Sequence, residues 1–204
     1  MIVYFHNGKG YDFHLILQAL AENKRVGTLK VIGNTMEKYT QIKARYFVIH
    51  DSMSHLIGSL DSLASSLLQR GEEGFDLIRN EFPKDNQFRC ALKKLVYPYD
   101  YINGFHRFLE PIPEIEHFYN RLNDEELAEE EYTRLMEACE IFDIKDLGQL
   151  HDLYLKIDTL ILACVFEDYR KLALEMTGLD PAYYIRFVQL KFNTLFFSIL
   201  SRSE

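Results

Sequence analysis

The spacing of hydrophobic positions changes character along the chain. Residues 2–5 form a short apolar run that predicts a buried strand. Residues 12–23 predict a helix whose apolar face is formed by Phe13, Ile16, Leu17 and Leu20. Residues 28–32, 38–43 and 45–50 alternate between apolar and polar and are separated by turn signals, which predicts a small antiparallel meander.

The remainder of the chain has mainly helical periodicity. We expect a helix starting at Ser59, short helices over 75–95, and longer helices over 123–142 and 146–177, the last stopped by Gly178 with Pro181 just beyond. Strands first and helices later favour an α/β or α+β class with a helical insertion. The expected divisions are a core over 1–70, an insertion over 71–145, C-terminal helices over 146–180 and a tail over 181–204.

Composition narrows the classes of protein. The 204 residues are 48% hydrophobic, enough for a sizeable core, and the net charge is -8. That charge argues against a free-standing protein that binds duplex DNA, although it leaves a metal-dependent nuclease open, because metal sites use carboxylates. Three cysteines without a C-x-x-C pair make a disulfide framework or zinc site unexpected and fit an intracellular, reducing compartment, nucleus or cytoplasm. No apolar stretch is long enough for a signal peptide or a membrane span.

A glycine-containing loop follows the first predicted strand. It reads Asn7-Gly8-Lys9-Gly10-Tyr11-Asp12, and α/β proteins place reactive groups at the ends of strands. Glycines let a backbone approach a ligand closely. Asp12 would stand at a helix start, either pointing into a crevice or simply capping the helix.

The long helix carries a second group, because Tyr154 and Asp158 are four residues apart and share a face, with His151 one turn earlier. A carboxylate can hold a divalent ion and a phenol can orient a water for phosphodiester hydrolysis. The alternative is a solvated face on which Asp158 pairs with a nearby lysine.

Two further segments could contact nucleic acid. Ser59 at a helix start could hold a backbone phosphate or be a plain cap. Lys93 and Lys94 precede Tyr97, Tyr99 and Tyr101, which could contact a phosphate and stack on bases. The same segment could equally be a loop that covers the core.

Taken in order, these motifs resemble the exonuclease domain of family-B DNA polymerases. Asn7-x-x-x-Tyr11-Asp12 resembles the second exonuclease motif, and Tyr154-x-x-x-Asp158 resembles the third. Ser59-Leu60 lies between them and looks like the single-strand-binding motif of the protein-primed subgroup, which serves viruses, linear plasmids and large transposons. Four stretches are similar to the transposon branch: residues 4–7, 49–52, 96–101 and 166–184. The resemblance covers about residues 3–184.

The resemblance implies a ribonuclease-H-like fold and removal of a mismatched nucleotide from a DNA 3′ end with Mg²⁺ or Mn²⁺. It makes Asp12 and Asp158 metal-binding catalytic carboxylates and Tyr154 the water-orienting tyrosine. The residues that match ligands of the frayed DNA end are Asn7, Tyr11, Ser59 and Leu60, and Lys94 matches a lysine between the two motifs, with Lys93 competing. Expected partners are single-stranded or primer-template DNA and, for the full-length parent, a terminal protein.

The sequence departs from the family in two places. The first motif, Asp-x-Glu, is absent and is expected upstream of Met1; Asp51 and Asp61 are poor substitutes, because they come in the wrong order. The palm expected after Tyr184 is also absent, so nucleotide addition by this chain is not expected, although the parent is a DNA-directed DNA polymerase (a nucleotidyltransferase of DNA replication). A sheet lacking the first-motif strand would expose an edge beside residues 2–5.

We therefore expect a polymerase fragment with an incomplete exonuclease domain that is inactive or nearly so by itself, and whether it is an enzyme stays open. Three alternatives remain: a non-catalytic module that binds single-stranded DNA, a helical interaction protein, and another ribonuclease-H-like nuclease with the same tyrosine-bearing third motif. The exonuclease hypothesis predicts that Asp12 and Asp158 converge on a shared divalent ion.

Overall fold

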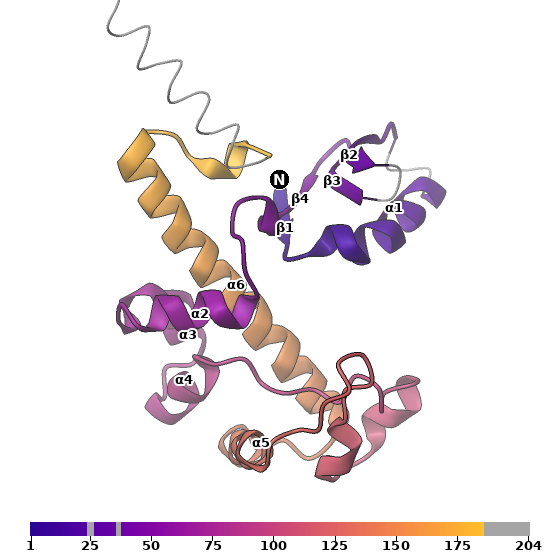
Figure 1. Ribbon diagram of the computed structural model, residues 1–204, viewed down its shortest axis with the longest axis vertical. Helices are drawn as coiled ribbons and strands as arrows, with labels where there is room; N and C mark the ends of the chain where they lie inside the picture. Colours follow the sequence, from indigo (N-terminus) through magenta and orange to yellow (C-terminus); the bar gives the residue numbers. More distant parts are fainter. Residues whose placement is uncertain (24–26, 36–37, 186–204) are drawn as a thin grey trace, which may run out of the picture. The chain divides into compact units, whose positions relative to one another are not determined.

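The computed structural model describes residues 1–23, 27–35 and 38–185, so most of the predicted tail over 181–204 lies outside the described residues. Its principal elements in chain order are β1 Ile2–Phe5, α1 Asp12–Glu22, β2 Lys30–Thr35, β3 Lys38–Lys43, β4 Val48–Asp51, α2 Leu60–Leu68, α3 Asp76–Glu81, α4 Asp85–Ala91, α5 Glu129–Ile141 and α6 Leu147–Thr177 (Figure 1). The described residues thus form an α/β fold with four strands and six α-helices.

The sheet is mixed, with strand order β1-β4-β3-β2. The antiparallel pairs β2–β3 and β3–β4 confirm the predicted meander. Its last strand begins at Val48 rather than at residue 45, because Ala44 and Phe47 close a turn in which the Ala44 N–H donates to the Phe47 carbonyl. β1 pairs with β4 in parallel, from Ile2 beside Val48 to Phe5 beside Asp51. The loops that follow β1 and β4 therefore leave the same end of the sheet.

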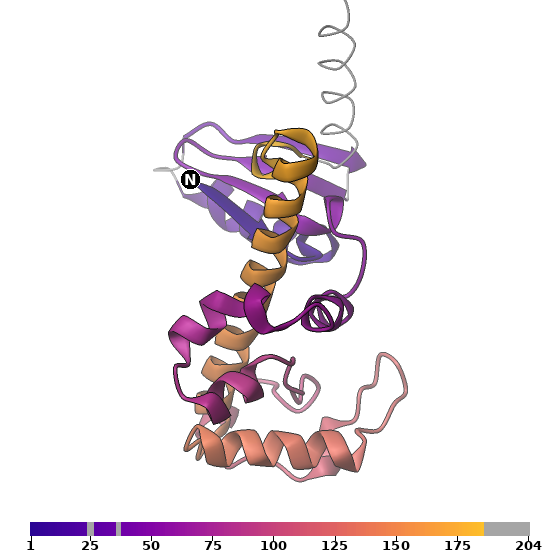
Figure 2. The same cartoon turned by 90° about the vertical axis from the view of Figure 1, so that its left-hand side faces the viewer.

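Alternation along the strands gives the sheet two different faces. On one face, α1 contributes Phe13 to a core with Ile42 and Ile49, and all three side chains are nearly or fully buried. On the other face, the Tyr4 ring lies 4.1 Å from the ring of Phe166 on α6. Figure 2 shows the sheet between α1 and the amber end of α6.

Two predicted helix starts are corrected by the structure. The N-cap position of α1 is Tyr11, and no side chain caps this helix, so Asp12 is its first residue rather than its cap. The acidic helix predicted from residue 123 begins at Glu129. Residues 123–128 form a loop instead, because Asp124 has a left-handed backbone with a φ of 57° and Glu125 pairs with Asn120 in an antiparallel bridge.

The chain divides into two compact units. Among the described residues, unit 1 contains those up to residue 60 together with residues 166–185, and unit 2 contains residues 61–165. These divisions differ from those expected at 70/71 and 145/146. The predicted long helix is confirmed as α6, which contributes residues to both units, and Gly178 follows its end with a φ of 68°. Within the described residues, none of the helices combines the length and the apolarity needed to traverse a bilayer.

Candidate functional site

The third-motif residues Tyr154 and Asp158 lie on one face of α6, within unit 2. This face packs against the chain that follows α4, and Tyr154 is only 5% exposed. The Asp158 side chain is 22% exposed to solvent. The alternative prediction of a solvated helix face is therefore wrong for Tyr154. Its second element, an ion pair between Asp158 and a nearby lysine, is confirmed.

The lysine is Lys94, whose Nζ lies 3.2 Å from Asp158 Oδ2 and 5.6 Å from the centre of the Tyr154 ring. Two features of the chain hold Lys94 in place. Its neighbours Leu92 and Leu95 are buried, and its carbonyl oxygen accepts a 2.6 Å hydrogen bond from Arg134 on α5. Lys93, by contrast, is exposed. The tertiary structure thus brings Lys94, rather than Lys93, to the third-motif pair.

Tyrosines from the segment after Lys94 surround Tyr154. The Tyr97 ring stacks on the Tyr154 ring, with centroids 4.7 Å apart, and the Tyr97 hydroxyl lies 2.6 Å from His151 Nδ1. The hydroxyl of Tyr99 hydrogen-bonds to that of Tyr154. Burial raises the pKa of Tyr154 well above its usual range, and the hydrogen bond to Tyr99 and the charge of Asp158 act in the same direction. Burial likewise raises the pKa of Tyr97 to about 12. Both phenols therefore remain protonated at neutral pH and can donate hydrogen bonds.

One carboxylate oxygen in this group lacks a partner. Asp158 Oδ1 is buried and accepts no hydrogen bond from the described residues, while Oδ2 pairs with Lys94. A buried oxygen of this kind is suited to a hydrogen-bond donor or a hard divalent cation. The fit to a complete metal site is partial, however, because the described residues contain no group of three His, Cys, Asp or Glu able to hold an ion.

A cavity of about 260 Å³ adjoins Tyr154 in unit 2. Lys94, Tyr97, Tyr99 and Tyr154 contribute to its lining. Acidic side chains contribute as well, namely Asp100, Glu125, Glu126 and Glu131. The aromatic part could stack on a nucleobase, but the carboxylates oppose a phosphate unless a cation accompanies it.

The second-motif loop lies in unit 1, between β1 and α1. Asn7 has a left-handed backbone with a φ of 64°, and residues Gly8–Gly10 form one turn of 3-10 helix. A Cβ added to Gly8 would lie 2.4 Å from the Phe13 ring, so the loop packs closely on the core. Tyr11 is 69% exposed beside it. Asn7 and Tyr11 thus stand together at the end of β1, at the start of the helix that begins with Asp12.

Asp51 fixes this loop to the sheet. Its carboxylate is fully buried and accepts backbone N–H groups of Asn7 at 3.0 Å, Lys9 at 3.2 Å and Met53 at 3.0 Å. The next residue, Ser52, donates to the Phe5 carbonyl at 3.0 Å and lies 2.9 Å from His6 Nδ1. The sequence pattern suggested Asp51 only as a poor substitute for a metal ligand. Its position at the end of the strand that pairs with β1 is what gives it a structural role.

The remaining candidates are divided between the units. Ser59 directly precedes α2, and Leu60, the first residue of that helix, is 9% exposed, so its side chain is mostly buried. Asn7, Tyr11, Asp12, Ser59 and Leu60 belong to unit 1, while Lys94, Tyr154 and Asp158 belong to unit 2. The structure therefore brings the third-motif residues and Lys94 together in one unit and the second-motif residues together in the other. Convergence of Asp12 with Asp158 stays a prediction.

Comparison with protein-family models, with curated proteins and with solved structures found no match to this chain. The function has to be inferred from the residues and contacts of the chain itself.

Proposed function

We propose that this chain is part of the 3′–5′ exonuclease domain of a family-B DNA polymerase, with a ribonuclease-H-like core, and that it binds a single-stranded DNA 3′ end. The observation that carries the proposal is the group formed by Lys94, Tyr154 and Asp158. A lysine predicted only from motif order lies 3.2 Å from the predicted metal-binding carboxylate, and both flank the predicted water-orienting phenol. A lysine beside Asp158 is also expected of a simple ion pair, so the support for the proposal is that this lysine is Lys94, which the motif order specifies, and not the exposed Lys93.

Each residue of the group has a distinct role in this proposal. Asp158 Oδ1, which has no partner among the described residues, would bind a divalent ion, while Lys94 holds Oδ2 and so fixes the rotation of the carboxylate. A bound Mg²⁺ or Mn²⁺ supplies Lewis-acid stabilisation of a phosphodiester. Tyr154 keeps its phenolic proton and donates a hydrogen bond that orients a water or a phosphate oxygen. Tyr97 and Tyr99 keep the Tyr154 ring in place.

The proposal includes slow or absent hydrolysis by this chain alone. Two-metal chemistry stabilises both the attacking and the leaving oxygen and needs several carboxylates around each ion. Within the described residues no group of three His, Cys, Asp or Glu gathers for an ion. Nucleotide addition by this chain is not part of the proposal.

The proposal is tested with a 5′-labelled single-stranded oligonucleotide in the presence of Mn²⁺. Fluorescence anisotropy measures its binding, and gel analysis detects any products of hydrolysis. Asp158→Asn and Tyr154→Phe should each weaken Mn²⁺-dependent binding by about tenfold or more, the loss expected for a charge-assisted or buried contact. Lys94→Ala should also weaken binding, because it frees the carboxylate that Lys94 holds, whereas the matched control Lys93→Ala should leave binding unchanged. Equal binding by Asp158→Asn and the parent, with and without Mn²⁺, would contradict the proposal.

A second candidate is a single-stranded-DNA-binding module without catalysis. The absence of a three-ligand group among the described residues favours it. The same gels separate the two, because a binding module releases no nucleotide at any Mn²⁺ concentration, whereas a weak exonuclease releases some and loses it in Asp158→Asn. Failure of the chain to bind DNA at all would leave the helical interaction protein as the leading hypothesis.

A further inference from the structure

The cavity that adjoins Tyr154 has an apolar and aromatic floor. Leu95, Phe118 and Tyr154 line it, and these side chains are 4%, 6% and 5% exposed. Tyr99 also lines the cavity, but it is 63% exposed, and its ring is nearly perpendicular to that of Tyr154. All four residues belong to unit 2, so the cavity is formed within one compact unit.

Hydrogen bonds between separate segments hold the walls of this cavity together. The Asp100 carboxylate accepts the Arg121 N–H at 3.0 Å, which ties the segment after α4 to the loop before α5. Asn120 and Glu125 exchange backbone hydrogen bonds of 2.9 and 3.2 Å in an antiparallel bridge. The walls are therefore fixed to one another by the fold of the unit itself.

The rim of the cavity is acidic. The carboxylates that contribute to its lining are Asp100, Glu125, Glu126 and Glu131. All four side chains are exposed, and none of them forms an ion pair with another described residue. Lys94 lines the cavity as well, but its ammonium group is already paired with Asp158 at 3.2 Å. The rim thus carries negative charge that the described part of the chain does not offset.

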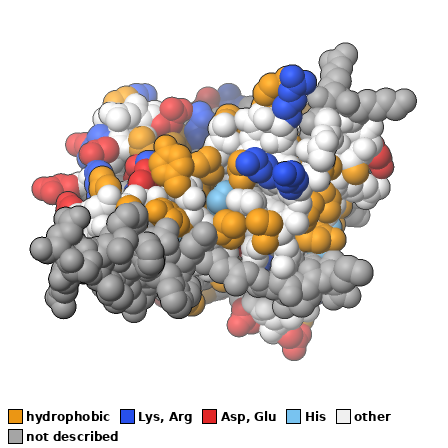
Figure 3. All heavy atoms as spheres, turned by 90° about the horizontal axis from the view of Figure 1, so that it is seen from above, with side chains coloured by type: hydrophobic (Ala, Val, Ile, Leu, Met, Phe, Trp, Pro, Cys, Tyr) orange, Lys and Arg blue, Asp and Glu red, His pale blue; other side chains and the backbone are white. Residues whose placement is uncertain are grey.

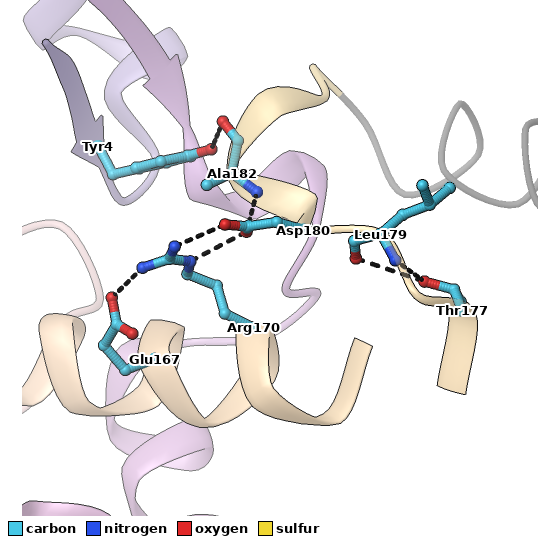
Figure 4. A network of polar contacts seen from close by, with 7 residues as sticks. All are labelled: Tyr4, Glu167, Arg170, Thr177, Leu179, Asp180 and Ala182. Carbon is cyan, nitrogen blue, oxygen red and sulfur yellow. Dashed lines mark hydrogen bonds and ion pairs between the residues drawn. The ribbon is translucent and has the colours of Figure 1, made fainter. Parts of the chain in front are cut away.

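The acidic side chains at the end of α6 in unit 1 are arranged differently. Asp180 accepts two hydrogen bonds from Arg170, at 3.0 Å from Nε and 2.6 Å from Nη2, and Arg170 also pairs with Glu167 at 2.6 Å (Figure 4). On the face shown in Figure 3, acidic and basic side chains are both visible among hydrophobic and neutral ones. The carboxylates around the cavity differ from this network because they lack a partner cation.

The lining discriminates between classes of ligand. The carboxylates repel a phosphate group. They are also too dispersed for a single metal ion, since the described residues contain no group of three His, Cys, Asp or Glu able to hold one. An organic cation fits both parts of the lining, because carboxylates attract its ammonium groups while rings attract the charge and cover its methylene groups. The Tyr154 ring already lies 5.6 Å from the ammonium nitrogen of Lys94.

We propose that the cavity binds a linear aliphatic polyamine, with its methylene groups on the floor and its ammonium groups at the acidic rim. Ammonium groups spaced along one chain match carboxylates that surround the cavity without meeting at a point. The volume of about 260 Å³ lies just below the range of about 300–1,000 Å³ found for drug-sized ligands, which suits a slender molecule. Binding requires neither DNA nor a metal ion, so this inference goes beyond the proposed exonuclease function.

Isothermal titration calorimetry of the whole chain with spermidine, a linear triamine, tests the proposal. The double variant Glu126→Gln/Glu131→Gln should bind spermidine about tenfold more weakly, because each exposed ion pair contributes up to about fivefold. The matched control Glu73→Gln/Glu140→Gln removes the same charge from exposed positions outside the lining and should bind like the parent. Equal weakening in the two double variants would show attraction to the net charge of -8 and would overturn the proposal.

A second ligand of the same charge tests the contribution of the floor. Hexaamminecobalt(III) is a compact trication without methylene groups, and it should bind at least about tenfold more weakly than spermidine, since each buried methylene contributes about fourfold. Equal affinity for the two trications would contradict a site that holds a polyamine chain.

Nuclear magnetic resonance of the unaltered chain locates the site without any substitution. Spermidine should shift amide signals around the cavity, over residues 94–100, 118–131 and 150–158, and leave those of α1 unchanged. Shifts distributed over acidic positions of both units would overturn the proposal.

Discussion

The ion pair between Lys94 and Asp158 should stabilise unit 2 measurably, and its removal is the sharpest test of the site geometry. The two charged atoms are 3.2 Å apart, and the side chains are 33% and 22% exposed. At an effective dielectric constant of about 20, Coulomb's law gives an attraction of roughly 5 kcal/mol at this separation. Partial desolvation and the ordering of the lysine chain oppose most of it. We expect a net coupling of about 1 kcal/mol, between the values of exposed and buried pairs.

The assay is a double-mutant cycle with Lys94→Met, Asp158→Asn and the double variant. The chain has 13 tyrosines and no tryptophan, so urea unfolding is followed by near-ultraviolet circular dichroism of tyrosine. Tyr97, Tyr99 and Tyr154 pack around the pair and contribute to that signal. Changes in the slope of free energy against urea would show whether the two units unfold separately.

A second cycle with Lys93→Met and Asp158→Asn is the matched control, because Lys93 is exposed and has the same charge. Its coupling should be near zero. If the Lys94 cycle also gave less than about 0.3 kcal/mol, within the additivity expected of independent sites, the structural assignment of Lys94 to Asp158 would be refuted.

Three further changes probe unit 1. Asp51→Asn should lower the free energy of unfolding by about 2 kcal/mol, because the amide has one acceptor oxygen in place of a carboxylate that holds three N–H groups; unchanged exchange of the Asn7 and Lys9 amides would contradict this. Gly8→Ala should destabilise the fold by about 1–3 kcal/mol in thermal melts, because its Cβ would lie 2.4 Å from the Phe13 ring. Gly10→Ala, whose Cβ would have its nearest contact at 3.5 Å, should be less destabilising. The hydrogen bonds from Arg170 hold the pKa of Asp180 below 3.8, so this pair stabilises the fold above that pH and the stabilisation is lost as the pH falls below it. Acid unfolding should therefore be less steep in Asp180→Asn, while Asp85→Asn, which removes an exposed ion pair with Arg79, should follow the parent.

Local pattern was sufficient for much of the secondary structure. The alternation through β2 to β4 and the long periodic stretch of α6 predicted these elements, because burial of one side of an element is encoded by neighbouring residues. The apolar run at residues 2–5 correctly predicted a strand, but the prediction that it is buried is wrong, since β1 is an edge strand whose residues are exposed or half-buried. The four-residue spacing of Tyr154 and Asp158 similarly predicts that both lie on one helix face, since residues four apart are neighbours on a helix surface. The start of α5 was missed because the left-handed backbone of Asp124 and the pairing of Glu125 with Asn120 are not recorded by helical periodicity.

The sequence by itself determined the elements, the class and the shared face of the third-motif residues. The motif order favoured Lys94 with Lys93 competing, and only the tertiary structure shows that Lys94 meets Asp158, because the buried leucines and Arg134 hold the chain there. It also decided that β1 pairs in parallel with β4, which turns Asp51 from a spare carboxylate into the anchor of the Asn7 loop. These choices join residues far apart in the chain, and their energies come from packing and desolvation that no local periodicity records.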